Sequence, residues 1–161
     1  MSKTQPIRPR MAVRATLAFA IVASQYNLAY VQPMVDHAHS EISALEPGAT
    51  VSLIWVPGAF EIPLAAKLVA SQRKFDAILS FGVILQGETA HATLVAQSVT
   101  SALQDIALEF LLPVIHEVLL LENEAQARAR CLGEEINRGT EGARAAVASA
   151  RTARELSTKL L

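Results

Sequence analysis

The part of the chain with the clearest potential for chemistry is GVILQGETAHATLV, residues 82–95. An apolar run of strand type ends in Gly-Glu-Thr, and a single histidine, His91, follows in what we expect to be the first turn of a helix. The free amides of Glu88 and Thr89, with the helix dipole, favour an anion such as phosphate, provided that the Glu88 carboxylate points elsewhere. The dipole also favours a neutral imidazole, so His91 would be a usable general base beside that anion. A solvated histidine without a chemical role is the alternative.

Two further polar segments follow apolar runs, and each contains residue types suited to a ligand. In SQYN, the ring of Tyr26 could stack on a flat heterocycle, and Asn27 could cap the next helix. In PGAFE, the carboxylate of Glu61 could accept hydrogen bonds from ligand hydroxyl groups. Arg130, later in the chain, could clamp a phosphate. Each also has a structural alternative: a packed aromatic ring, a favourable first-turn carboxylate, or a solvated arginine on a helix.

The elements that must position these residues alternate along the chain. The expected strands are 17–23, 51–56, 76–85 and 114–121, and the expected helices are 28–45, 62–71, 89–110, 124–135 and 140–160. Nearly continuous apolar strands between helices predict an α/β fold, a single doubly wound domain with a four-stranded parallel sheet flanked by helices. In such a fold ligands bind at the carboxyl ends of the strands, so SQYN, PGAFE and QGETAH should converge on one crevice.

Composition restricts the class of protein. The 161 residues suit one domain with one core, and the formal net charge of −1 gives no reason to expect nucleic acid or a membrane surface as a partner. Apolar residues make up 52% of the chain and charged ones only 18%, so we expect part of the apolar surface to lie between subunits. The lone Cys131 excludes an internal disulfide and is consistent with a reducing compartment, the cytoplasm. No apolar run approaches the ~20 residues of a membrane span.

The N-terminal segment admits two interpretations. Its basic residues are Lys3, Arg8, Arg10 and Arg14, and no acidic residue precedes Asp36. Followed by the apolar run TLAFAIVA, this pattern is similar to a signal peptide, but it lacks a clear small-x-small cleavage site. We therefore interpret residues 1–16 as a basic N-terminal extension and 17–161 as an α/β domain that begins with a buried strand.

Several motifs occur together at specific spacing: VPGAFEIP, then GETAH, then PVI, and finally ENEAQA…NRG. This combination resembles lumazine synthase (6,7-dimethyl-8-ribityllumazine synthase), a transferase family of riboflavin biosynthesis, in register from about residue 17 to 151. The resemblance implies a flavodoxin-like fold. It also implies the condensation of 5-amino-6-(D-ribitylamino)uracil with 3,4-dihydroxy-2-butanone 4-phosphate to give 6,7-dimethyl-8-ribityllumazine, phosphate and water. No metal or cofactor is implied, because the amine is already nucleophilic and phosphate leaves readily.

The resemblance also implies roles for individual residues. The catalytic histidine corresponds to His91. The phosphate-binding positions are Glu88, Thr89 and Arg130. The pyrimidine- and ribityl-binding positions are Tyr26, Ala59, Phe60, Glu61, Val83, Ile84, Leu85 and His116. Tyr26 would stack on the pyrimidine, and residues 83–85 would face it through their backbone.

The assembly implied by the resemblance is a homo-oligomer built of pentamers, alone or as units of larger shells. The N-terminal segment would add to a neighbour's sheet. Each site would span two subunits, with Tyr26, Glu61 and His91 from one and His116 and Arg130 from the next.

The sequence departs from the family pattern at several positions. Three single residues differ near the expected site: Gln86 occupies the position of a usual Arg, His116 that of a Phe and Glu117 that of a Gly. Ala92-Thr93 replace an aromatic-acid pair, Leu120-Leu121 replace a polar pair, and Glu134 replaces a frequent Lys. These changes concern substrate affinity more than the fold. The alternative function is a lumazine- or flavin-binding or shell-forming relative with little turnover, against which the retention of Glu61, His91 and Arg130 argues.

Overall fold

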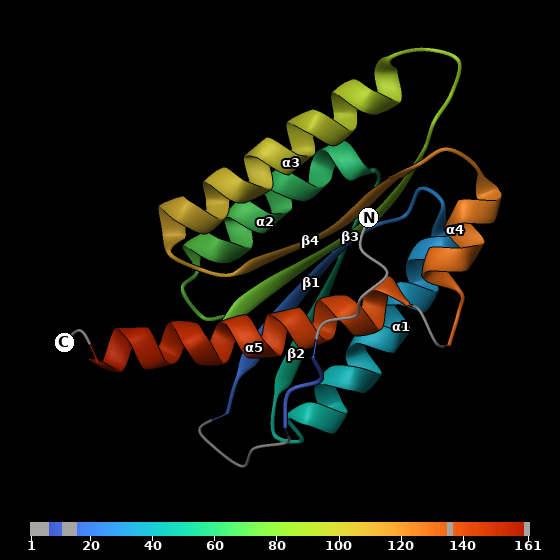
Figure 1. Cartoon of the computed structure of the whole chain (residues 1–161). Helices are drawn as coiled ribbons and strands as arrows, with labels where there is room; N and C mark the ends of the chain where they lie inside the picture. Colours follow the sequence, from blue (N-terminus) through green and yellow to red (C-terminus); the bar gives the residue numbers. More distant parts are fainter. Residues whose placement is uncertain (1–6, 11–15, 135–136, 160–161) are drawn as a thin grey trace.

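The structure is a computed structural model that describes residues 7–10, 16–134 and 137–159 (Figure 1). Within these residues four strands form one sheet: β1 (Ala18–Ser24), β2 (Thr50–Val56), β3 (Ala77–Leu85) and β4 (Val114–Leu121). All neighbouring strands pair in parallel, in the order β2-β1-β3-β4. The predicted α/β fold with a four-stranded parallel sheet is therefore confirmed, and its arrangement is flavodoxin-like.

The two central strands explain why the apolar runs are nearly continuous. After Ala18, every residue of β1 is buried, and β3 is buried from Ala77 to Val83. Strands covered on both faces need apolar residues at successive positions, not only at alternate ones. The run TLAFAIVA thus supplies the first central strand, as the strand interpretation of this segment predicted.

Helices cover both faces of the sheet (Figure 1). The helices α2 (Ile62–Ser71) and α3 (His91–Phe110) cover one face, and α1 (Leu28–Leu45), α4 (Glu124–Cys131) and α5 (Arg138–Lys159) cover the other. Side chains of a strand point alternately to its two faces, so Phe19 and Ile21 join the core beneath α1 and α5, whereas Ala20 and Val22 join the core beneath α2 and α3. Among the described residues, no helix combines the length and apolarity that crossing a membrane requires.

The junction between α4 and α5 differs from the prediction. We expected one helix to end at residue 135 and the next to begin at 140, but α4 ends at Cys131 and α5 begins at Arg138. Asn137 gives the physical reason. Its Nδ2 donates to the Cys131 carbonyl at 2.8 Å, and its Oδ1 accepts from the Gly139 amide at 2.8 Å, as a helix N-cap does. The predicted helix end at residue 135 falls on a residue outside the described part, and so does the end at 160.

The start of α3 also differs from the prediction. We expected this helix to begin at Thr89, but it begins at His91, with Ala90 as the N-cap and the first helical bond from the Leu94 amide to the Ala90 carbonyl at 3.1 Å. The hydroxyl oxygen of Thr89 accepts a long hydrogen bond of 3.4 Å from the His91 amide. Threonine favours such a local bond just before a helix over a position inside it.

Part of the N-terminal extension contacts its own chain. Arg8 Nε lies 2.8 Å from Glu41 Oε1 on α1, and Arg151 Nη1 on α5 donates to the Arg10 carbonyl at 2.7 Å. Burial alone would raise the pKa of Glu41, but the hydrogen bonds and charges of Arg8 and Arg144 outweigh it and hold that pKa below its usual value. The expected pairing of the extension with a neighbour's sheet stays a prediction.

Candidate active site

Hydrogen bonds join the segments that follow neighbouring strands at the carboxyl edge of the sheet. The loop after β1 bonds to the end of β2, with the Gln25 amide donating to the Val56 carbonyl at 2.8 Å and the Tyr26 amide to the Pro57 carbonyl at 3.0 Å. The Gln86 amide, just after β3, donates to the Leu121 carbonyl at the end of β4 at 2.8 Å. The predicted polar segments therefore occupy one edge of the sheet, where ligands of this fold class bind.

Tyr26 is presented to solvent at this edge. Its side chain is 74% exposed, and its ring lies over Gly58, where an added Cβ would be 3.6 Å from Tyr26 Cδ2 and 2.9 Å from Glu61 Oε2. Tyr26 and Glu61 thus flank the same glycine. An aromatic ring left open to water at a strand end suits a stacking platform better than it suits a packed core position.

Asn27 does not cap α1 through its side chain, contrary to the prediction. Its backbone is left-handed, with φ 57° and ψ 38°, and its Nδ2 donates to the Val83 carbonyl on β3 at 2.7 Å. Asparagine tolerates the left-handed region better than most residues. The bond across the edge fixes the Tyr26 loop relative to β3.

The carboxylate of Glu61 has a structural role in the first turn of a short helix, and it can still accept hydrogen bonds from a ligand. Glu61 ends a short 3₁₀ turn, η1 (Ala59–Glu61), and its Oε2 accepts from the Gly58 amide at 2.8 Å. A carboxylate has two oxygens with about four acceptor sites, so this bond orients the group without exhausting it. Within the same turn, Ala59 is buried and Phe60 is exposed.

The backbone of β3 is open on one side at this edge. Pairing with β1 ends at Phe81, whereas pairing with β4 continues to Leu85. Residues 83–85 therefore project beyond β1, with Val83 buried and Ile84 and Leu85 half-buried. Backbone groups of a strand without a neighbour need other partners, such as the Asn27 side chain or a ligand.

The loop 86–90 is exposed and held by weak polar contacts. Gln86 Nε2 donates to the carbonyls of Gly87 and Thr89 at 3.2 and 3.3 Å, and Thr93 Oγ1 donates to Gln86 Oε1 at 3.4 Å. Glu88, Thr89 and His91 are all exposed. Because α3 begins at His91, the amides of Glu88 and Thr89 precede the helix. The first-turn amides, which have no partner within the helix, start with His91, whose amide donates to Thr89 Oγ1.

His116 is not brought to these loops within one chain, and Arg130 lies on a different face of the sheet from α3. His116 pairs with Ser80, five positions before Leu85 on β3, which places it roughly 16 Å from the carboxyl edge. Arg130 lies half-buried on α4, on the opposite face of the sheet from α3. A single subunit therefore supplies only one part of the residue set that the sequence predicted.

Comparison with known proteins decides the family. A family model described as 6,7-dimethyl-8-ribityllumazine synthase matches residues 16–154. The chain belongs to this family. It is similar to the 6,7-dimethyl-8-ribityllumazine synthase of Coxiella burnetii, strain Dugway 5J108-111, with 36% identity over 88% of this chain and 95% of the relative. The protein of that name from Clostridium kluyveri, strain ATCC 8527, is 36% identical over 87% of this chain and 92% of the relative. The one from Paraburkholderia phymatum is 38% identical over 85% of this chain and 78% of the relative. The family predicted from the motifs is confirmed.

One of the positions that the sequence marked as unusual holds a buried acid. Glu117 on β4 lies beneath α5, where a Cβ added to Gly142 would be 3.1 Å from its Cγ. Burial raises the pKa of Glu117 to about 7; Arg138 opposes the shift and Glu141 adds to it. Burial, with the nearby Glu117 charge, also raises the pKa of the Cys131 thiol to about 11, so this thiol is not a reactive thiolate.

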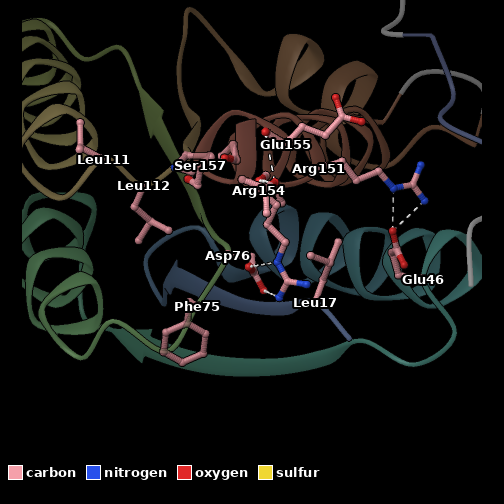
Figure 2. Close-up of a pocket in the computed structure, with 14 residues that line it drawn as sticks. Leu17, Glu46, Phe75, Asp76, Leu111, Leu112, Arg151, Arg154, Glu155 and Ser157 are labelled. Carbon is pink, nitrogen blue, oxygen red and sulfur yellow. Dashed lines mark hydrogen bonds and ion pairs between the residues drawn. The ribbon is translucent and has the colours of Figure 1, made fainter. Parts of the chain in front are cut away.

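A cavity lies at the opposite edge of the sheet from the lumazine synthase motifs. It has a volume of about 710 Å³ and is lined by residues at the amino ends of β1 and β3 and on α5 (Figure 2). Its polar walls are ion pairs: Arg154 Nε lies 2.6 Å from Asp76 Oδ1, and Arg151 Nη2 lies 2.7 Å from Glu46 Oε1. Four of its charged groups are thus engaged with each other, and Glu155 lies 3.8 Å from Lys159, a residue outside the lining. None of the predicted site residues lines the cavity.

Two contacts at or near the predicted residues were not foreseen. The sequence could have indicated part of the bond from Asn27 to Val83, because an asparagine between a strand and a helix is typical of a left-handed turn. Nothing in the sequence indicated the bond of 2.8 Å between His116 Nε2 and Thr100 Oγ1. It depends on how α3 packs across β4, which local sequence patterns do not specify.

Proposed function

We propose that this chain condenses 5-amino-6-(D-ribitylamino)uracil with 3,4-dihydroxy-2-butanone 4-phosphate to give 6,7-dimethyl-8-ribityllumazine, phosphate and water. One observation carries the proposal: the exposed ring of Tyr26 stands at the edge where β3 projects beyond β1, in a chain that belongs to the lumazine synthase family. A stacking surface beside open backbone groups suits a heterocycle with several donors and acceptors.

The pyrimidine and its ribityl chain occupy the Tyr26 side of this edge. Tyr26 stacks on the ring, and the backbone of residues 83–85 hydrogen-bonds its polar rim. The segment Ala59–Glu61 lines the ribityl chain, and the Glu61 carboxylate, already oriented by the Gly58 amide, accepts from its hydroxyl groups. The exposed Phe60 supplies apolar contact.

The phosphate of the second substrate lies by the loop 86–90, with Glu88 and Thr89 contributing their amides and His91 beside them. The 5-amino group attacks the ketone, and water leaves to form an imine. Phosphate is then eliminated together with the proton on the neighbouring hydroxyl-bearing carbon, and the resulting enol becomes a second ketone. The ribitylamino nitrogen attacks this ketone and a second water leaves, which closes the ring. His91 moves protons in imine formation and elimination. Holding two substrates together supplies much of the acceleration, because no strongly activated nucleophile is needed.

The site is completed by a neighbouring subunit in a pentameric ring. Support comes from the position of His116, which a single chain holds roughly 16 Å from the carboxyl edge, and from α4, which carries Arg130 on the opposite face of the sheet from α3. Further support comes from large apolar side chains left exposed on α2 and α3: Leu64, Leu68, Leu94 and Leu108. In the ring, His116 of one subunit faces the pyrimidine bound to the next, and Arg130 reaches its phosphate-binding loop. We further propose that the enzyme works in the cytoplasm, where its single, buried Cys131 stays reduced.

The activity is tested by mixing the purified full-length protein with both substrates and following lumazine formation by its absorbance. Reactions that lack either substrate correct for background, and omission of protein measures spontaneous condensation. We expect turnover that requires both substrates. A folded, ring-forming protein that binds lumazine but does not form it would contradict the proposal and favour the binding or shell-forming alternative.

A further inference from the structure

The imidazole of His116 has a defined partner. His116 lies on β4, an edge strand of the sheet, on the face that α3 covers, and it is half-buried. Its Nε2 lies 2.8 Å from the hydroxyl oxygen of Thr100 on α3. The same hydroxyl oxygen lies 2.8 Å from the carbonyl oxygen of Ala96, one helical turn earlier.

Counting protons assigns the tautomer of this histidine. A threonine hydroxyl has one proton, and a carbonyl oxygen has none. Two oxygens 2.8 Å apart need a proton between them, so the Thr100 hydroxyl donates to Ala96 and accepts from His116. The proton in that second bond must be on Nε2. In a neutral imidazole Nδ1 is then an acceptor.

Nδ1 is not used by the groups around it. Within the described part of the chain, the bond to Thr100 is the one hydrogen bond of the His116 ring. Ser80, its register partner on β3, is fully buried, and its hydroxyl has no hydrogen-bond partner there. The Nδ1 lone pair therefore has capacity for one further hydrogen-bond donor.

We propose that Thr100 is a positioning residue, which holds His116 as the Nε2–H tautomer so that Nδ1 accepts a hydrogen bond from an N–H group of the pyrimidine substrate. This inference rests on the proposed function, in which His116 faces the pyrimidine bound to the adjoining subunit. An aminouracil carries N–H groups on its ring and its amino substituents, and an acceptor fixed in direction selects for them. In the proposed site the phosphate substrate lies by the loop 86–90, so it does not take part in this contact.

Kinetics on the assembled protein separate this role from a structural one. Thr100→Val keeps the shape of the side chain but removes the hydroxyl, and Thr100→Ser keeps the hydroxyl. For Thr100→Val we expect KM for the pyrimidine to rise roughly 5- to 10-fold, the effect of one hydrogen bond, with KM for the butanone phosphate unchanged and kcat nearly so. Thr100→Ser should match the wild type. In a His116→Phe background, Thr100→Val should have no effect on KM.

The tautomer is read directly from the ¹⁵N shifts of the labelled histidine ring, assigned by the signals that His116→Phe removes. We expect Nε2–H in the wild type and in Thr100→Ser, and loss of that preference in Thr100→Val. A wild-type Nδ1–H tautomer, or an unchanged pyrimidine KM in an active Thr100→Val enzyme, overturns the inference while leaving the proposed function intact. A wild-type protein without turnover instead overturns the proposed function, and with it the substrate half of the inference.

Discussion

At the scale of single residues, the proposed acid–base role of His91 can be tested most directly. It is solvent-accessible at the first position of α3, so its removal leaves no cavity. We expect His91→Ala to slow turnover by roughly 10²-fold or less, because one acid–base group is lost while proximity of the two substrates remains. His39→Ala, an exposed histidine on α1, is the matched control and should be fully active. Lumazine formation measures both, and unchanged turnover in His91→Ala would remove His91 from its proposed role.

Glu117 makes stability depend on pH in a direction opposite to that of an ion-paired acid. Because its folded pKa is raised from 4.5 to about 7, the folded state binds more protons than the unfolded state between these values. Stability should therefore fall as pH rises from about 4.5 to 7, by about 3 kcal/mol at 1.36 kcal/mol per pKa unit.

The matched variant for this effect is Glu117→Gln, which keeps the shape of the protonated acid. We expect the stability of this variant to lack the pH dependence that Glu117 contributes. Its free energy of unfolding relative to the wild type should therefore increase across this pH range and be largest above pH 7. Urea unfolding at several pH values and one fixed protein concentration measures the difference. Parallel stability curves for the two proteins would show that Glu117 does not titrate in this window.

At the scale of elements, the contact between α5 and α1 depends on Gly139. A Cβ at this position would lie 1.9 Å from the Met34 carbonyl oxygen, so Gly139→Ala must push the two helices apart. The gain in helix propensity is at most about 1 kcal/mol, whereas overpacking against backbone costs about 1–3 kcal/mol or more. We expect net destabilisation, measured by thermal unfolding. Gly48→Ala, whose Cβ would meet only Thr16 Oγ1 at 4.0 Å, should be nearly neutral.

The same elements show how far a sequence alone carries. Hydrophobic periodicity predicted the strands and helices to within a few residues, and the family motifs located the carboxyl-edge loops. The errors fell at helix ends, where long-range or local side-chain bonds decide: Asn137 reaches back to Cys131, and Thr89 bonds to the His91 amide. The contact of Thr100 with His116 lay beyond local patterns because it joins two elements across the packed face of the sheet.

At the scale of the whole molecule, the proposed site requires residues from two subunits, so its arrangement predicts how the subunits assemble. One chain presents Tyr26, Glu61 and His91 at the carboxyl edge, whereas His116 lies deeper along β4 and Arg130 lies on the opposite face of the sheet from α3. A ring is a heterologous assembly, so each subunit offers these two halves to different neighbours. Loss of either half should then be complemented by a neighbour that retains it.

Mixed rings test this sharing directly. His91→Ala and Arg130→Ala chains, each prepared as poorly active rings, are unfolded, combined in equal amounts and reassembled. With random mixing, about one interface in four pairs an intact His91 face with an intact Arg130 face, so activity per site should return to roughly a quarter of the wild-type value. Rings of each variant taken alone through the same unfolding and reassembly are the controls, and mass spectrometry verifies that both chains are present in the mixed rings. If such rings are no more active than the parent variants, His91 and Arg130 do not serve one site shared between neighbouring subunits.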